Sequence, residues 1–186
     1  KELTRGKHNN VKAKYFKDGT KISFITNRLR LDYGGKVFIM NEDGSNQIPL
    51  DTTRSASSDA IPSFVTNELY FLYGLAEGNF GAYKINLDSV TLPTSDKSFH
   101  LFYSGYEFDY AVLSPDSRYF ITIGPGESVY HDLYLWSTDG LRNERVTIGY
   151  NVPIFTYNWS PNSQQIIVRC WKLPVQDTSK ILIYDL

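Results

Sequence analysis

The chain has 186 residues, of which 41% are hydrophobic and 21% are charged. Lysine and arginine number 19 and aspartate and glutamate 20, so the net charge of -1 gives no general attraction to nucleic acid or to an anionic membrane. The single cysteine, Cys170, excludes an internal disulfide and a multi-cysteine zinc site, and no apolar run is long enough for a membrane-spanning helix.

Short segments in which apolar and polar residues alternate recur along the chain. They include KISFIT (21–26), ELYFLY (68–73), DLYLW (132–136) and KILIYD (180–185). This period of two, together with 14 tyrosines and 11 phenylalanines, is typical of half-buried β-strands. No segment has the apolar spacing of an amphipathic helix. The sequence therefore predicts an all-β fold.

Two sequence motifs, called phrases below, each occur four times, with similar spacing. The first is a turn followed by a strand, and its copies are FKDGTKISF from Phe16, FVTNELYF from Phe64, LSPDSRYFI from Leu113 and WSPNSQQII from Trp159. The second is a strand followed by a turn or a chain end, and its copies are VFIMNEDGSN from Val37, AYKINLDSV from Ala82, LYLWSTDGL from Leu133 and ILIYDL from Ile181. The shared period predicts four units, each a four-stranded antiparallel sheet.

Turn residues stand at matching places in these units. Pro115 and Pro161 fix φ at the first corner of a tight turn, and Gly19, Gly44 and Gly140 supply positive φ. An isolated sheet of this kind would leave an apolar face in water, whereas sheets stacked around an axis bury both faces. The repeats therefore predict a β-propeller.

The paired phrases resemble the TolB-type, or WD-like, propeller repeat. The closest copies here are FKDGTKISFITN and KVFIMNEDGSNQIPL, and the resemblance covers essentially the whole chain, although the second copy is degraded. In that family, propellers serve as periplasmic protein-binding domains, as substrate-gating domains of prolyl-oligopeptidase-like enzymes, and as modules of bacterial surface proteins. The resemblance specifies architecture better than function.

We expect one propeller domain over residues 1–186, with blades at about 11–51, 59–104, 107–149 and 153–186. Residues 1–5 resemble an outer strand, and this strand would complete the fourth blade and close a four-bladed ring without free sheet edges. Two alternatives stay open, namely four blades of a six- or seven-bladed parent propeller and a dimer of half-rings. The chain is expected to be part of a larger multidomain protein.

The connections between the second and third strands of each predicted blade, and those that lead from one blade to the next, emerge on the same face, and the former are long. Loops held by a rigid scaffold commonly carry function, and tyrosine, tryptophan and arginine dominate binding hot spots. We therefore predict a binding surface that contains Arg28, Arg30, Asp32, Tyr33, Phe80, Glu127, Tyr130, His131, Trp171 and Lys172.

Catalytic and metal-binding motifs are incomplete. GESVY (126–130) begins like a G-x-S-x-G nucleophile elbow but ends in tyrosine, and His8, His100 and His131 lack the spacing of metal ligands. Lysine and arginine are frequent near the N-terminus, but without interleaved aromatic residues they do not indicate nucleic-acid binding. We predict no catalytic residue, metal or cofactor.

The sequence thus predicts a non-catalytic binding module that holds a protein or glycan partner, with no nucleic acid and no direct membrane insertion. The family resemblance implies a bacterial envelope protein in the periplasm or at the cell surface, and a cytoplasmic location stays open. The alternative is a propeller domain associated with a serine-peptidase-type, prolyl-oligopeptidase-like or other hydrolytic enzyme.

Overall fold

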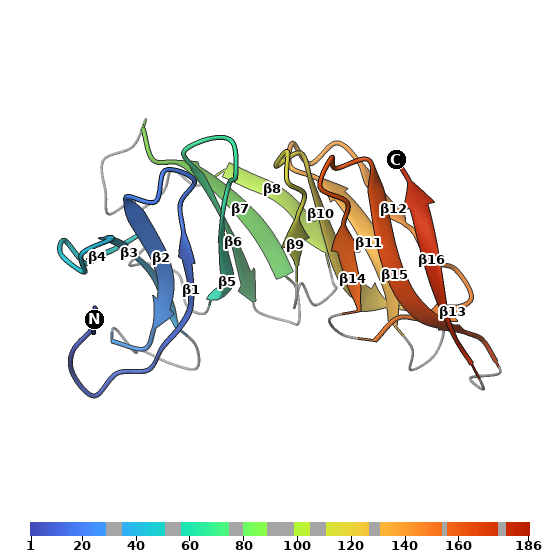
Figure 1. The fold of residues 1–186 in the computed structure, drawn as a ribbon, viewed down its shortest axis with the longest axis horizontal. Helices are drawn as coiled ribbons and strands as arrows, with labels where there is room; N and C mark the ends of the chain where they lie inside the picture. Colours follow the sequence, from blue (N-terminus) through green and yellow to red (C-terminus); the bar gives the residue numbers. More distant parts are fainter. Residues whose placement is uncertain are drawn as a thin grey trace. The chain divides into compact units, whose positions relative to one another are not determined.

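A computed structural model of the chain describes residues 1–28, 35–50, 57–74, 80–88, 99–104, 111–126, 131–153, 156–174 and 178–186. These residues form β-strands and no α-helix, which confirms the all-β prediction. The chain divides into two compact units, Lys1–Gly105 and Tyr106–Leu186, and each unit holds two antiparallel sheets (Figure 1). No described segment is a helix of the length and apolar character that crossing a membrane requires.

The first unit contains two sheets whose strands pair in chain order. The first sheet comprises β1 (Asn10–Tyr15), β2 (Lys21–Thr26), β3 (Lys36–Asn41) and β4 (Ile48–Pro49), and the second comprises β5 (Ser57–Pro62), β6 (Glu68–Gly74), β7 (Phe80–Asn86) and β8 (Phe99–Ser104). Each is the up-and-down meander predicted for a blade.

The second unit begins with a third meander. Its strands are β9 (Val112–Leu113), β10 (Tyr119–Pro125), β11 (His131–Ser137) and β12 (Asn143–Arg145). The fourth sheet comprises β13 (Tyr150–Asn151), β14 (Tyr157–Trp159), β15 (Gln165–Lys172) and β16 (Ser179–Asp185). In it, β16 pairs along one edge of β15, and β14 and β13 pair with successive parts of the other edge. The innermost strand is therefore split in two, and it starts before the expected boundary at residue 153.

Each unit has a hydrophobic core between its two sheets. In the first unit, Val37 and Ile39 of β3 pack with Leu69 of β6 and Ile85 of β7. In the second unit, the core joins the third and fourth sheets, and its buried members are Ile121, Ile123, Leu133, Leu135, Val152, Tyr157, Trp159, Ile166, Val168 and Cys170. Because side chains alternate between the faces of a strand, each sheet turns one apolar face toward its neighbour in the unit.

The short turns show how the repeats align. The amide of Gly19 donates to the carbonyl of Phe16 over 2.9 Å, and the equivalent bond in the fourth sheet runs from Ser163 to Ser160 over 3.0 Å. Phe16 therefore corresponds to Ser160, and matching it with Trp159 from the sequence is wrong by one residue. The first residue of this turn is phenylalanine in the first sheet and serine in the fourth sheet. The hydrophobic residue used to align the repeats therefore lies one position earlier, at Trp159, in the fourth sheet.

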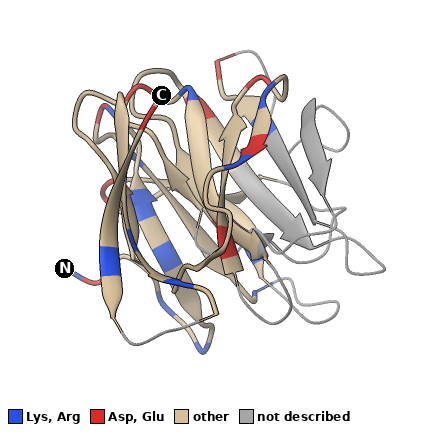
Figure 2. Cartoon of the chain, turned by 90° about the vertical axis from the view of Figure 1, so that its right-hand side faces the viewer, with Lys and Arg blue, Asp and Glu red and all other residues tan. Residues whose placement is uncertain are grey.

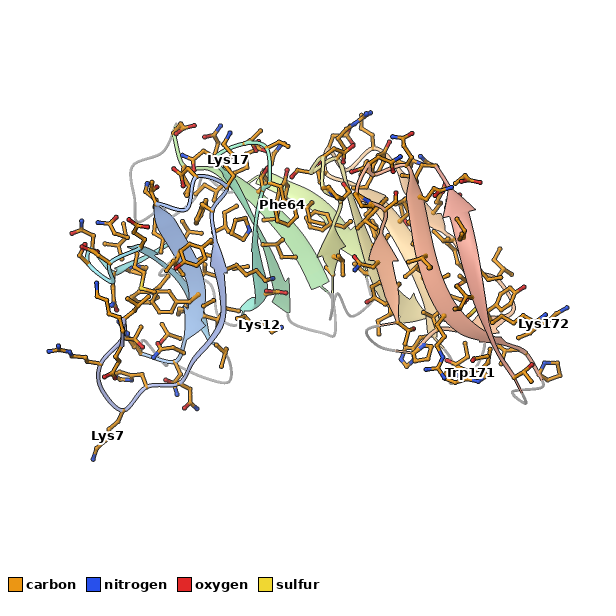
Figure 3. The ribbon with its side chains drawn as sticks, viewed as in Figure 1. Lys7, Lys12, Lys17, Phe64, Trp171 and Lys172 are labelled. Carbon is orange, nitrogen blue, oxygen red and sulfur yellow. The ribbon has the colours of Figure 1, made fainter. Side chains whose placement is uncertain are left out.

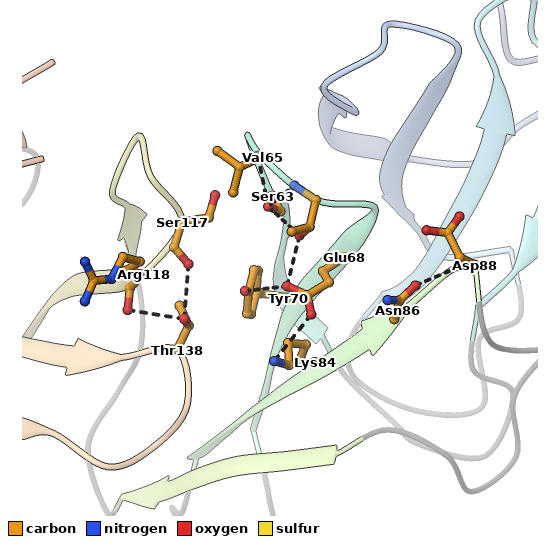
Figure 4. Close-up of polar contacts among 11 residues, drawn as sticks. Ser63, Val65, Glu68, Tyr70, Lys84, Asn86, Asp88, Ser117, Arg118 and Thr138 are labelled. Atoms are coloured by element: carbon orange, nitrogen blue, oxygen red, sulfur yellow. Dashed lines mark hydrogen bonds and ion pairs between the residues drawn. The ribbon is translucent and has the colours of Figure 1, made fainter. Parts of the chain in front are cut away.

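The turn of the second sheet lacks glycine and proline, and side chains hold it instead. The hydroxyl of Ser63 accepts hydrogen bonds from the amides of Val65, over 3.2 Å, and Thr66, over 3.0 Å (Figure 4). Beside it, the carboxylate of Glu68 accepts a hydrogen bond from the Tyr70 hydroxyl over 3.1 Å. Serine oxygens can replace a backbone acceptor in a turn, which explains why this degraded copy still forms a sheet.

Residues 1–5 form no strand. Leu3 packs against the buried Ile22, Phe24, Phe38 and Met40 of the first sheet, and its carbonyl accepts a hydrogen bond from Nε2 of Gln47 over 2.9 Å. Closure of a ring by this N-terminal segment, and the number of blades in that ring, remain predictions.

Candidate binding surface

The structure describes the side chains of four of the ten predicted surface residues, namely Arg28, His131, Trp171 and Lys172. Phe80 is described as the first residue of β7, without its side chain. The others lie outside the described residues, and they are Arg30, Asp32, Tyr33, Glu127 and Tyr130.

The described candidates of the second unit belong to strand ends, whereas the sequence predicts them in loops. His131 is the first residue of β11, and Trp171 and Lys172 are the last two of β15. Both strands run further than predicted because they find partners at these ends: Pro125 pairs with His131, and β13 pairs with the last two residues of β15. Strand ends are more rigid platforms for a binding site than loops are.

The two residues of β13 bring these strand ends together. Asn151 pairs with Trp171, and its side-chain Oδ1 accepts a hydrogen bond from the backbone amide of His131 over 3.5 Å. The carbonyl of His131 accepts a hydrogen bond from the amide of Val152 over 2.9 Å. His131, Asn151, Trp171 and Lys172 therefore gather at one end of the second unit, and we call them the strand-end cluster. Figure 3 shows Trp171 and Lys172 at this end of β15.

Cations accompany the tryptophan of the cluster. The guanidinium of Arg169 lies 4.9 Å from the centre of the Trp171 ring, within the range of a cation–π interaction. Arg169, Lys172 and His131 are exposed and Trp171 is half-buried. The surface thus combines an aromatic ring with two exposed cationic side chains and an exposed imidazole.

A buried polar network supports the cluster from below. Asp132, which follows His131, is fully buried and accepts hydrogen bonds from the hydroxyl of Thr147 over 2.9 Å and from Nε of Arg145 over 2.6 Å. The same hydroxyl accepts a hydrogen bond from the amide of Leu133 over 2.9 Å. Because a buried carboxylate requires such partners, Asp132 serves to position the start of β11.

Arg28 belongs to the first unit and covers the face of the first sheet. Its guanidinium lies 5.7 Å from the centre of the Phe24 ring and 5.8 Å from that of Phe38, and its Nη1 donates to the side-chain oxygen of Gln47. Its Nε and Nη2 are buried and have no hydrogen-bond partner among the described residues. These contacts give Arg28 a packing role, and a role in ligand binding remains a prediction.

The described residues contain no group of three or more histidine, cysteine, aspartate or glutamate side chains that could hold a metal ion. Cys170 lies in the core of the second unit, where burial raises the pKa of its thiol. A thiol with a raised pKa is a poor nucleophile near neutral pH.

Comparison with known proteins identifies the fold. No family model matches the chain, and no curated protein matches it. The chain is similar to a solved structure described as TolB from Agrobacterium tumefaciens, with a TM-score of 0.65 and 14% identity over 94% of this chain and 61% of that one. It is also similar to the β-propeller domain of the trilobed protease from Pyrococcus furiosus, with a TM-score of 0.68 and 11% identity over 96% of this chain and 55% of that one.

A third similar structure is an acylaminoacyl peptidase from Pyrococcus horikoshii, with a TM-score of 0.65 and 10% identity over 96% of this chain and 31% of that one. The chain has a TolB-like β-propeller fold, in which each four-stranded sheet is a blade. It spans little more than half the length of the first two structures, and at these identities the likeness extends to the fold alone.

Proposed function

We propose that the chain is a non-catalytic propeller module that binds a protein or glycan partner through the strand-end cluster. One observation carries the proposal: β13 joins His131 of β11 to Trp171 and Lys172 of β15, so the ends of two separate strands are held together at one end of the second unit. Tryptophan is enriched among residues that dominate binding energy, and a site on paired strands is held in place before the ligand arrives.

The chemistry of the cluster favours a partner that carries acidic groups next to an apolar or sugar-ring surface. Trp171 offers a flat apolar ring, while Lys172 and Arg169 offer exposed cationic donors. Carboxylates accept charge-assisted hydrogen bonds from such donors, and these are stronger than bonds between neutral groups. Acidic protein segments and acidic oligosaccharides both meet this description.

Binding to defined acidic probes tests the proposal. Oligogalacturonate and a glutamate-rich peptide would be titrated into the chain, with neutral oligogalactose and a glutamine-rich peptide as matched controls, while tryptophan fluorescence is recorded. We expect saturable binding of one acidic probe, weakened about 30-fold by Trp171→Ala, which corresponds to the loss of a hot spot of about 2 kcal/mol.

Lys172→Ala should weaken the same binding by a smaller factor, and Leu141→Ala, which changes an exposed residue outside the cluster, should leave it unaltered. The same variants would be compared in capture from extracts of the native host, followed by identification of the captured proteins. Equal capture and equal probe binding by wild type and by the Trp171→Ala/Lys172→Ala double variant would refute the proposed surface.

A second candidate function is that of a propeller associated with a hydrolytic enzyme. It is favoured by the similarity to the propeller of the trilobed protease and to the acylaminoacyl peptidase, of which this chain matches only 31%. Assays with chromogenic esters and aminoacyl anilides separate the candidates. We expect no turnover by the chain, and turnover abolished by His131→Ala would favour the enzyme.

We further propose an extracytoplasmic location, which is supported by the TolB-like fold. Fractionation of the native host, with antibodies against the chain, tests it directly. Recovery in the cytoplasmic fraction would contradict the location without bearing on the binding surface.

A further inference from the structure

The turn between β5 and β6 carries two exposed apolar side chains. Phe64 is 57% exposed and Val65 is 48% exposed, and both belong to the five residues 63–67, which we call the Phe64 turn. The turn stands at an end of the second sheet, whereas the sheets of a propeller stack face to face. A further blade would therefore cover a face of a sheet and leave this tip in water.

The equivalent turns of the other three sheets carry no aromatic or β-branched residue at these two places. In every sheet, the amide of the first turn residue donates to the carbonyl five residues later, and these bonds begin at Phe16, Ser63, Ser114 and Ser160. By this alignment, Phe64–Val65 corresponds to Lys17–Asp18, Pro115–Asp116 and Pro161–Asn162. Proline, aspartate and asparagine favour such a turn, and phenylalanine and valine do not. A local rule that is broken at an exposed place is a mark of function.

Hydrogen bonds to the backbone hold the tip in place without using its apolar side chains. The Ser63 hydroxyl accepts hydrogen bonds from the amides of Val65 and Thr66. From the first blade, Nζ of Lys17 donates to the carbonyl of Val65 over 2.7 Å. Figure 3 shows Lys17 and Phe64 at the same end of the first unit. An anchor that is held before its partner arrives loses little conformational entropy on binding.

The shape of the turn indicates which kind of partner fits it. Small ligands are bound in concave sites that enclose most of their surface, whereas the tip of a turn is convex. Phe64 and Val65 therefore suit a macromolecule that supplies the pocket. Side chains that fill a pocket of the partner in this way commonly dominate the binding energy of an interface.

Charges around the tip distinguish between classes of macromolecule. Asp88 lies beside it and accepts a hydrogen bond from the side-chain amide of Asn67 over 2.6 Å. Among the described residues of the turns at this end of the first unit, Lys17 is the exposed cation, and the exposed carboxylates are Asp18, Glu42, Asp43 and Asp88. In Figure 2, acidic residues in red mark turns at the upper end of the sheets. This excess of carboxylates disfavours nucleic acid and anionic membranes and favours a basic surface.

We propose that the Phe64 turn anchors a protein partner whose apolar pocket has basic residues at its rim. Phe64 and Val65 enter the pocket, which is favourable in proportion to the apolar area removed from water. Asp18 and Asp88 face the basic rim. The turn shares no residue with the strand-end cluster, so the proposal is independent of the proposed function.

Photo-crosslinking of the full-length protein in the native host tests the proposal. Phe64→p-benzoylphenylalanine places a photoreactive ring at the tip. Leu141→p-benzoylphenylalanine is the matched control, because Leu141 is 87% exposed in the connection between β11 and β12 of the third blade. After irradiation, we expect a crosslinked product that contains a second protein at position 64 and none at position 141. Mass spectrometry identifies the second protein.

Titration of the purified second protein decides whether the crosslink reports docking. Phe64→Ser and Val65→Ser should each weaken binding about 20-fold, because each removes a side chain that fills the pocket. Asp88→Asn should weaken binding about threefold and reduce its dependence on salt, since it removes a charge from the rim. Leu141→Ser and Trp171→Ala should leave the affinity unaltered, and Trp171→Ala thereby separates this surface from the strand-end cluster.

The stability of the variants separates docking from a role in folding. Because both side chains are about half exposed, the thermal unfolding midpoints of Phe64→Ser and Val65→Ser should stay within about 5 °C of the wild-type value. A larger fall would show that these side chains stabilise the chain itself and would overturn the proposal. Absence of a crosslink at position 64, a crosslink to lipid or within the same protein, equal crosslinking at position 141, or unchanged affinity in both serine variants would overturn it as well.

Discussion

The first and fourth blades differ in what lies on the face that each turns away from its neighbouring blade. On the first blade, Phe24 and Phe38 are buried beneath Leu3 and the guanidinium of Arg28. On the fourth blade, Ile167, Ile181 and Ile183, on the face turned away from the third blade, are largely exposed. Both blades have the same alternating strand pattern. The comparison shows that the pattern specifies an apolar face, whereas residues outside the strands determine whether the chain covers it.

The cover of the first blade relies on few residues. Arg28 lies two residues after the end of β2, and Gln47 links it to the N-terminal segment by bonding both its Nη1 and the carbonyl of Leu3. Long cationic side chains commonly shield apolar surface with their stems and ring-facing heads. In the fourth blade, the described residues that directly follow β15 are Leu173 and Pro174, and neither carries a cationic side chain.

The largest expected effect contrasts two equivalent residues, Leu133 of the third blade and Ile181 of the fourth. Leu133→Ala should lower the free energy of unfolding by about 3 kcal/mol, because it leaves a cavity in a packed core. Ile181→Ala should cost under about 0.5 kcal/mol, because Ile181 is 70% exposed. Urea unfolding measures both values. Equal losses of unfolding free energy in the two variants would mean that Leu133 and Ile181 are equally buried.

A smaller loss is expected when the cover of the first blade is removed. Arg28→Ala should lower the free energy of unfolding by about 2 kcal/mol, since Phe24 and Phe38 lose their cation–π partner and become accessible to water. Arg118→Ala is a matched control, because Arg118 lies 5.7 Å from the Tyr119 ring at an exposed position. If Arg118→Ala lowered the free energy of unfolding by the same amount, the loss would come from the cation–π contact itself. It would then not come from exposure of the Phe24 and Phe38 rings to water.

The tight turns of the two blades give a third test. Gly19 has φ of 71°, and Ser163 at the equivalent place has φ of 60°, so both lie in the left-handed region. Gly19→Ala should cost about 1 kcal/mol, because a Cβ is unfavourable there even though no neighbour lies in its way. Gly19→Asn should cost less, since asparagine adopts this conformation readily. Thermal unfolding that is unchanged in the alanine variant would contradict the assigned turn.

The smallest effect concerns the covered side of the fourth blade. The hydroxyl of Tyr184 donates to Glu144 over 2.6 Å, and this bond, with the Arg142 guanidinium, holds the pKa of Glu144 below its ordinary 4.5. A lowered folded-state pKa contributes stability that is present above pH 4.5 and is lost as the pH falls through the lowered value. Glu144→Gln should therefore lower stability slightly at neutral pH and weaken its loss in acid. Thermal unfolding across this pH range measures the difference, and parallel curves would exclude the linkage.

Part of the candidate site was predictable from sequence. His131, Trp171 and Lys172 are of residue types common at binding surfaces and stand near predicted connections, so sequence analysis selected them, although it assigned them to loops. Asn151, which joins them, was missed because a two-residue strand has no period to detect. Arg169 was missed because an arginine at an alternating position reads as an ordinary exposed strand residue.

The sequence by itself determined the strands, their grouping into four blades and the apolar side of each strand, because these depend on alternation and turn chemistry within a few neighbouring residues. Only the tertiary structure decided that Arg28 and Leu3 cover one blade, that three isoleucines of another stay exposed, and that Asn151 joins two strand ends. Such contacts link residues far apart in the chain, and their energy depends on distances that a linear pattern does not record.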